Sequence, residues 1–168
     1  MKELILITED DVELLQVLVD DLKDLGMEII TATNGKIGLE LAKKHNFSMI
    51  LSDISMPEMN GLEFLKSIRL HGLEVPFIVL SGNGDRQNTM MALRWGAFDF
   101  LDKPYEYEEL LKKVKDASAL GLYQYEIAEQ INSICASKSF NPEEALKFKD
   151  ITKRQMLMRF ESKAHDKK

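Results

Sequence analysis

Phe47-Ser-Met-Ile-Leu-Ser52 is a short, mostly apolar segment, and a carboxylate, Asp53, follows it directly. A segment of this length and composition predicts a strand that is buried on both faces of a parallel sheet. Functional side chains in such sheets gather beyond the carboxyl ends of the strands. Asp53 is therefore a candidate functional residue, although a single aspartate in this position more often caps a turn or a helix.

Similar apolar segments lie on both sides of this one within the first 120 residues. The four segments comprise residues 4–7, 27–32, 76–81 and 98–102. The sequence between them has apolar residues at helical spacing, and the residues predicted to be helical are 12–25, 36–45, 62–70, 86–95 and those from about 106 onward. Alternation of this kind predicts an α/β domain in which helices flank a parallel sheet of five strands. We expect this doubly wound domain to comprise residues 1–120.

The apolar pattern of the last predicted helix continues past that boundary. Leu120, Ile127 and Ile134 are seven residues apart, which favours a helix that extends to about residue 136. Gly121 is a candidate break in this helix.

A second helix start follows. Asn141-Pro142-Glu143-Glu144 has the residue types that are preferred at a helix N-terminus. The pattern beyond it is ambiguous, because residues 146–149 alternate as a strand does, whereas residues 156–160 suit a helix. We expect residues 121–168 to form a helical C-terminal extension.

Composition and charge limit the classes of function. Of the 168 residues, 45% are hydrophobic and 30% are charged, which is typical of a soluble globular protein. The net charge is −6; residues 1–120 contribute −8 and residues 121–168 contribute +2. An acidic domain argues against general nucleic-acid binding. The N-terminal apolar segment is too short for a signal peptide or a membrane span, and the single cysteine, Cys135, cannot form an internal disulfide, so we expect a cytoplasmic protein.

Polar residues follow four of the five predicted strands. Glu9-Asp10-Asp11 comes after the first, Asp53 after the third, Ser81 ends the fourth and Lys103 follows the fifth. Three carboxylates at one rim repel each other and favour a bound cation, and oxygen ligands suit Mg²⁺ better than Ca²⁺ or zinc. A carboxylate can attack an anionic phosphoryl group when Mg²⁺ and a lysine neutralise the charge, and a hydroxyl can donate to a phosphoryl oxygen.

The segments Ile5–Asp11, Ile50–Gly61, Val79–Gly82 and Phe98–Pro104 resemble the receiver domain of bacterial two-component response regulators. The resemblance covers roughly residues 1–120. It implies a flavodoxin-like (βα)₅ fold with the strand order 2-1-3-4-5.

The resemblance also implies roles for single residues. Asp53 is expected to accept a phosphoryl group from a sensor histidine kinase or a phosphotransfer protein. Glu9, Asp10, Asp53 and the backbone carbonyl of Ser55 are expected to hold Mg²⁺. The protein would then be a signalling switch that catalyses only its own phosphorylation and dephosphorylation.

Further roles follow for residues after the fourth and fifth strands. Lys103 is expected to pair with the phosphoryl group, and the peptide bond between Lys103 and Pro104 is expected to be cis. Ser81 and Phe100 are expected to move together as the switch, although the family more often has tyrosine at the position of Phe100. The face formed by the fourth helix, the fifth strand and the fifth helix is the expected output surface.

Two positions are expected to set the lifetime of the phosphorylated form. Ser55 and Asn83 stand two residues beyond Asp53 and Ser81, beside the path of a hydrolytic water molecule. Because neither is an obvious general base, we expect slow to moderate self-dephosphorylation.

The output of the protein is the least determined part of the sequence. The extension lacks a pattern for a helix-turn-helix, although basic residues in 153–168 could contact nucleic-acid phosphates, so a DNA-binding regulator is the alternative. We favour a stand-alone receiver whose extension mediates homodimerisation or docking to another protein. An aspartyl-phosphate hydrolase would need an acid where Ser55 stands, and a flavin-binding module would need a phosphate loop in place of Glu9-Asp10-Asp11.

Overall fold

The structure is a computed structural model that describes residues 3–82, 86–138 and 140–165, with side chains as far as Met158. The chain divides into two compact units, Met1–Gly121 and Leu122–Lys168. The boundary falls inside one helix, α5 (Tyr107–Ser137), whose first part belongs to the first unit and whose second part belongs to the second.

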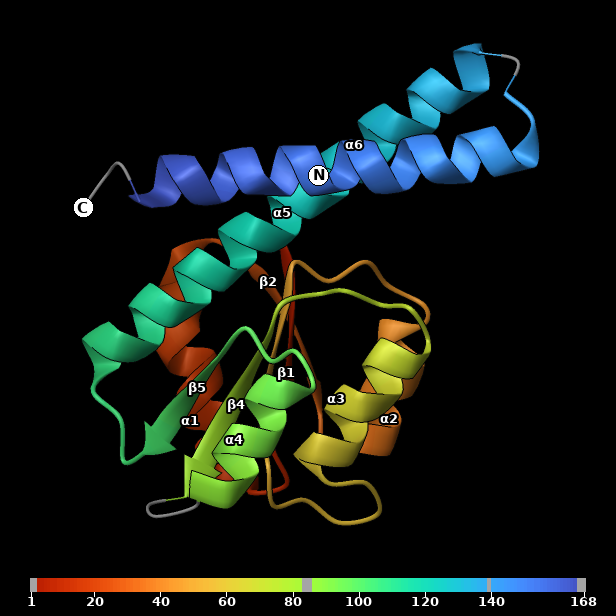
Figure 1. Ribbon diagram of the computed structural model, residues 1–168. Coiled ribbons are helices and arrows are strands. Elements are labelled where there is room, and N and C mark those ends of the chain that lie inside the picture. Colours follow the sequence, from red (N-terminus) through yellow and green to blue (C-terminus); the bar gives the residue numbers. More distant parts are fainter. Residues whose placement is uncertain (1–2, 83–85, 139, 166–168) are drawn as a thin grey trace. The chain divides into compact units, whose positions relative to one another are not determined.

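The first unit is built on one parallel sheet (Figure 1). Its five strands have the order β2-β1-β3-β4-β5. The strands are β1 (Leu4–Thr8), β2 (Glu28–Ala32), β3 (Met49–Asp53), β4 (Phe77–Gly82) and β5 (Asp99–Lys103). Every residue of β3 is buried, as its continuous apolar sequence predicts. The sheet and its strand order confirm the predicted (βα)₅ fold.

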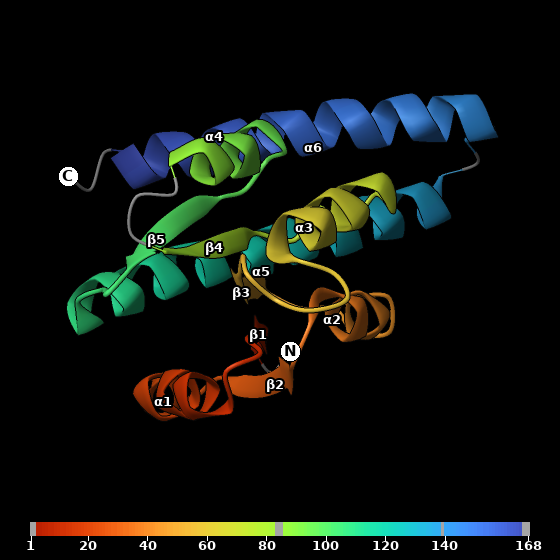
Figure 2. The same ribbon diagram turned by 90° about the horizontal axis from the view of Figure 1, so that it is seen from below.

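Helices cover both faces of the sheet (Figure 2). They are α1 (Val12–Leu22), α2 (Gly35–Ala42), α3 (Gly61–Leu70), α4 (Arg86–Arg94) and the first part of α5. Leu18 of α1 and Val114 of α5 belong to one buried apolar cluster, and Leu39 of α2 and Phe64 of α3 belong to the other. Successive residues of β1, such as Ile5 and Leu6, point into opposite clusters, as the period of a strand requires.

Side-chain caps fix where three of these helices begin. The carboxylate of Asp11 accepts hydrogen bonds from the first turn of α1, and the amide oxygen of Asn34 accepts one from Ile37 N–H at the start of α2. Asn60 and Glu63 form a reciprocal capping box at the start of α3. These caps lie on the loops that follow the strands, so they also position the rim of the sheet.

The predicted helix at residues 12–25 ends in a tighter turn. Its last three residues form the 3₁₀ helix η1 (Lys23–Leu25), and Gly26 closes it with a φ of 73°. The predicted helix at 36–45 is shorter than expected and ends at Ala42.

Gly121 does not break α5, and its interpretation as a candidate break is wrong. A Cβ atom at this position would lie 1.7 Å from the carbonyl oxygen of Ser48, so only glycine allows the helix to approach the start of β3. One turn earlier, the hydroxyl groups of Ser118 and Ser48 form a buried hydrogen bond of 2.7 Å. The glycine therefore allows α5 to pack closely against the start of β3 within the first unit.

The second unit contains the end of α5 and the helix α6 (Pro142–His165). Asn141 and Glu144 form the predicted capping box, with hydrogen bonds of 2.9 and 3.0 Å. Residues 146–149 belong to α6, so their strand-like alternation does not produce a strand. The Tyr123 hydroxyl donates to the carbonyl oxygen of Met156 over 3.1 Å, so α6 lies against the end of α5.

Within the described part of the chain, no helix is both long enough and apolar enough to cross a lipid bilayer.

Candidate functional site

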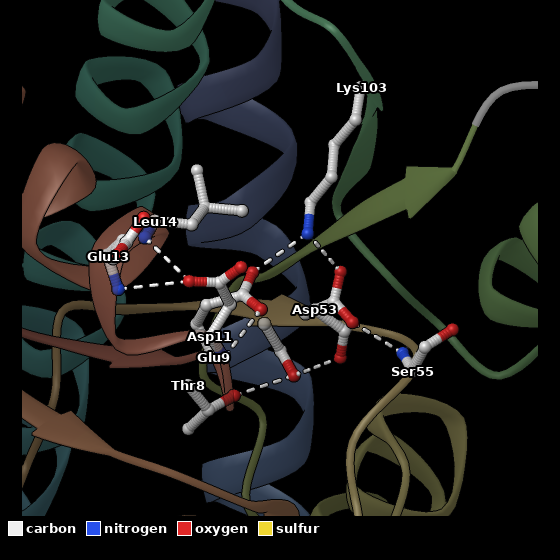
Figure 3. Close-up of polar contacts among 9 residues, drawn as sticks. Thr8, Glu9, Asp11, Glu13, Leu14, Asp53, Ser55 and Lys103 are labelled. Atoms are coloured by element: carbon white, nitrogen blue, oxygen red, sulfur yellow. Dashed lines mark hydrogen bonds and ion pairs between the residues drawn. The ribbon is translucent and has the colours of Figure 1, made fainter.

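The carboxyl ends of β1, β3 and β5 bring three charged side chains together at one rim of the sheet (Figure 3). The ammonium group of Lys103 lies 2.8 Å from Oε2 of Glu9 and 2.5 Å from Oδ1 of Asp53. Glu9 and Asp53 retain only 2% and 5% of their accessible surface. One cation thus contacts two carboxylates that are almost fully buried.

The conformation of Asp53 is fixed from several directions. Its Oδ2 atom accepts a hydrogen bond of 2.5 Å from the backbone N–H of Ser55. Its carbonyl oxygen accepts one from the Ser52 hydroxyl at 2.9 Å, and that hydroxyl in turn accepts one from Thr8 at 2.7 Å. A Cβ atom on Gly61 would lie 2.1 Å from the same carbonyl oxygen, so the chain turns tightly beside the site.

Three carboxylates are close enough to share one metal ion. One oxygen each from Glu9, Asp10 and Asp53 lies within 4.8 Å of the others, and Asp10 is the exposed member. These are hard oxygen donors, and the exposed side leaves room for water ligands, which Mg²⁺ usually retains. The donor set therefore fits Mg²⁺. Ser55 is the other expected ligand residue, and its N–H group donates a hydrogen bond to Oδ2 of Asp53.

The charges at the site are only partly compensated. Burial and the negative charge of Asp53 raise the pKa of Glu9, although the hydrogen bond from Lys103 opposes this. Burial disfavours the charged form of Lys103, but its hydrogen bonds to Asp53 and Glu9 outweigh that effect and raise its pKa. Lys103 therefore stays protonated, and the carboxylates still carry excess negative charge that a divalent cation would balance.

Ser81 lies at the end of β4 and is fully buried. Its hydroxyl donates to the carbonyl oxygen of Gly82 and accepts from the Thr89 hydroxyl of α4, both over 3.3 Å. In the sheet it lies opposite Asp102, the neighbour of Lys103. Among the described residues, the Ser81 hydroxyl bonds to Gly82 and Thr89 and not to the carboxylate cluster.

Phe100 lies in β5 and is partly buried. The ammonium group of Lys113 in α5 is 5.6 Å from the centre of its ring and also forms an ion pair of 2.5 Å with Asp99. A cation over an aromatic face is attracted to it. Phe100 has no phenolic oxygen, but the ammonium group of Lys113 provides a polar contact for its ring.

Two further expectations concern the loops of the site. The peptide bond between Lys103 and Pro104 is cis, as expected. Asn83, which is expected to influence hydrolysis, lies outside the described residues.

Several contacts at the site could not be found from the sequence. Thr8 and Ser52 belong to no motif that the sequence reveals, and the hydrogen bond between them depends on strand register. Thr89 and Lys113 lie on amphipathic helices, where exposed polar residues are expected anyway. To place Thr89 beside Ser81 and Lys113 beside Phe100, the rotation of each helix about its own axis would have to be predicted.

Comparisons with known proteins agree on one family. The family model of the response regulator receiver domain matches residues 5–115. The cell cycle response regulator CtrA of Brucella ovis is 31% identical over 110 residues, which are 66% of this chain and 47% of that protein. The chain thus spans about half the length of the curated relatives it matches.

Solved structures give the same result. A putative response regulator from Chloroflexus aurantiacus has a TM-score of 0.67 and 29% identity, and the match covers 71% of this chain and 99% of that one. The chemotaxis response regulator CheY4 of Vibrio cholerae has a TM-score of 0.64 and 30% identity, with 70% and 99% covered.

Proposed function

Because the chain belongs to the response regulator receiver family of two-component signalling, we propose that it acts in the cytoplasm as a switch in which Asp53 accepts a phosphoryl group. The observation that supports this most strongly is the position of Lys103, whose ammonium group contacts both Asp53 and Glu9. The donor would be the phosphohistidine of a sensor histidine kinase or a phosphotransfer protein.

The transfer forms one bond and breaks another. A carboxylate oxygen of Asp53 attacks phosphorus, the bond between phosphorus and the histidine nitrogen breaks, and the imidazole keeps the electron pair and takes up a proton. The ammonium group of Lys103 moves from pairing with the carboxylate to pairing with a phosphoryl oxygen. Its hydrogen bonds to Asp53 and Glu9 raise its pKa, which favours the charged form that pairs with a phosphoryl oxygen.

Glu9, Asp10, Asp53 and the Ser55 carbonyl would hold Mg²⁺. When bound, Mg²⁺ supplies positive charge that reduces the repulsion between the carboxylates and the incoming phosphoryl group. The N–H group of Ser55 keeps Asp53 oriented for attack through its hydrogen bond to Oδ2.

Ser81 would convert phosphorylation into a change of surface. Its hydroxyl can turn from Gly82 to donate to a phosphoryl oxygen, and this would weaken its hydrogen bond with Thr89 of α4. Phe100 in the adjacent strand would respond to the space that is vacated. The output surface would comprise α4, β5 and the first part of α5.

The second unit would mediate self-association or docking. Leu146, Ile151 and Met158 are large apolar side chains of α6 that remain more than half exposed. Contact with a second copy would remove them from water. The alternative of a DNA-binding output has less support, because residues 142–165 form one long helix instead of the short helix pair of a helix-turn-helix.

Incubation with acetyl phosphate, with and without Mg²⁺, tests the proposal. Phosphate-affinity electrophoresis should show a slower band only when Mg²⁺ is present, and Asp53→Asn should abolish it. Asp10→Asn should slow its appearance, since that substitution removes a metal ligand and leaves the acceptor intact. Equal labelling of the Asp53→Asn variant would contradict the proposal.

A further inference from the structure

The loop that follows Asp53 is bound to the turn that precedes α2. The side-chain amide of Asn34 donates a hydrogen bond of 3.3 Å to Oε1 of Glu58, and the ammonium group of Lys36 lies 3.5 Å from Oε2 of the same carboxylate. Next to this pair, the N–H group of Gly35 donates to the carbonyl oxygen of Met59 over 3.0 Å. Two loops from different βα units are thus joined by side-chain and backbone contacts.

Asn34 has two separate partners. Its Oδ1 atom accepts a hydrogen bond from Ile37 N–H and caps α2, while its amide nitrogen donates to Glu58. The residue is 4% exposed, so both groups need protein partners. The cap requires only an acceptor at this position, whereas the contact with Glu58 requires a donor.

Glu58 has an unusual backbone conformation. Its φ is 63°, in the left-handed region that residues other than glycine rarely adopt. Such a conformation persists only when the surrounding contacts hold it. In the described part of the chain, the carboxylate of Glu58 accepts a hydrogen bond from Asn34 and forms an ion pair with Lys36.

The same loop carries the groups that orient Asp53. Ser55, three residues before Glu58, donates its N–H group to Oδ2 of Asp53. The loop has little freedom between these points, because the carbonyl oxygen of Ile54 accepts hydrogen bonds from both Met56 and Gly61. Ser55 and Glu58 thus belong to one short loop, whose two ends are joined by the hydrogen bond from Gly61 N–H to the Ile54 carbonyl oxygen.

We propose that Asn34 is a positioning residue for the metal and phosphoryl site, because its hydrogen bond to Glu58 holds the β3–α3 loop in the conformation in which Ser55 and Asp53 would hold Mg²⁺. This inference rests on the proposed function. It assigns to Asn34 a role that is separate from capping α2.

An exchange of donor and acceptor tests the pair. Asn34→Asp keeps an acceptor for Ile37 N–H but removes the amide donor and places two carboxylates against each other. The double variant Asn34→Asp/Glu58→Gln restores one donor and one acceptor in the reverse order. Asn141→Asp is the matched control, since it makes the same change at the cap of α6, in the second unit.

Two readouts are measured by NMR, with thermal unfolding as the check that each variant is folded. The first is the Mg²⁺ dissociation constant, and the second is the set of backbone amide shifts of residues 54–60 without metal. Asn34→Asp should weaken Mg²⁺ binding about tenfold, the lower end of what outer-shell partners of metal ligands contribute. It should also move the amide shifts, and the double variant should reverse both effects.

The possible failures are distinguishable. If wild type binds Mg²⁺ and Asn34→Asp binds it equally well, the inference is overturned while the proposed function stands. Failure of Glu58→Gln to restore binding in the double variant, with both proteins folded, would also overturn it. If wild type binds no Mg²⁺, the proposed function is overturned and the inference with it.

Discussion

The ammonium group of Lys103 lies 2.5 Å from Oδ1 of Asp53, although fifty residues separate them in the sequence. The contact exists because β3 and β5 run parallel and end at the same rim, on either side of β4. The same ammonium group contacts Glu9, so one cation forms ion pairs with two buried carboxylates. The site is therefore short of positive charge, and most of its expected behaviour follows from that shortage.

Lys103→Met should lower the free energy of unfolding by about 2 kcal/mol in the absence of Mg²⁺, because it leaves two buried carboxylates without their cation. Urea denaturation measures the loss. Lys23→Met, which removes an exposed ion pair with Asp20, is the control and should leave stability unchanged. Equal stability of wild type and Lys103→Met would contradict the charge balance described for the site.

Mg²⁺ should stabilise the folded protein, since only the folded chain brings Glu9, Asp10 and Asp53 together. At a concentration about 100 times its dissociation constant, the ion should add about 2.7 kcal/mol to the free energy of unfolding. Chelation should reverse the gain, and Asp10→Asn should reduce it. Asp20→Asn, on the exposed side of α1, should keep the full response. A gain that is the same in Asp10→Asn would show that the ion acts elsewhere.

Gly121→Ala should destabilise the first unit by about 2 kcal/mol or more, although alanine is normally the better helix former. The added Cβ atom would overlap the carbonyl oxygen of Ser48 and push α5 away from the sheet. Thermal or urea unfolding tests this. Glu126→Ala, at an exposed position of the same helix, should change stability by less than about 0.5 kcal/mol. An increase in stability for Gly121→Ala would refute the close approach.

Trp95 should report activation by fluorescence. It is the only tryptophan, it follows α4 directly, and its ring lies 5.6 Å from the ammonium group of Lys66 in α3. Beryllofluoride, which imitates the phosphoryl group on an aspartate, should change its emission if α4 responds to the site. Ser81→Ala should still bind the mimic but show a smaller change. No change in wild type, with binding demonstrated separately, would contradict the proposed output surface.

The fold was predictable because hydrophobic periodicity is a local property. Five apolar segments separated by amphipathic stretches were sufficient to predict the parallel sheet, and the Asn141–Glu144 capping box was predictable from four adjacent residues. The errors have a different origin. Gly121 is a typical helix-ending residue in sequence, and only the distance to Ser48, from a different element, shows why a glycine is needed inside this helix.

The composition of the site was predictable because strand ends in a parallel sheet meet at one rim. That rule brings Glu9, Asp53 and Lys103 together without any knowledge of distances. Contacts between neighbouring loops were not predictable, since they depend on loop conformation. The pairing of Asn34 with Glu58 is an example, because nothing in the local sequence of Glu58 indicates a positive φ.

The most direct test of the account is to locate the phosphoryl group. After incubation with acetyl phosphate and Mg²⁺, mass spectrometry should find one hydroxylamine-labile addition of about 80 Da, the mass of a phosphoryl group, on the peptide that contains Asp53. The Asp53→Asn variant should lack it. A modified peptide that does not contain Asp53, or the absence of any such addition with every phosphoryl donor tried, would contradict the account.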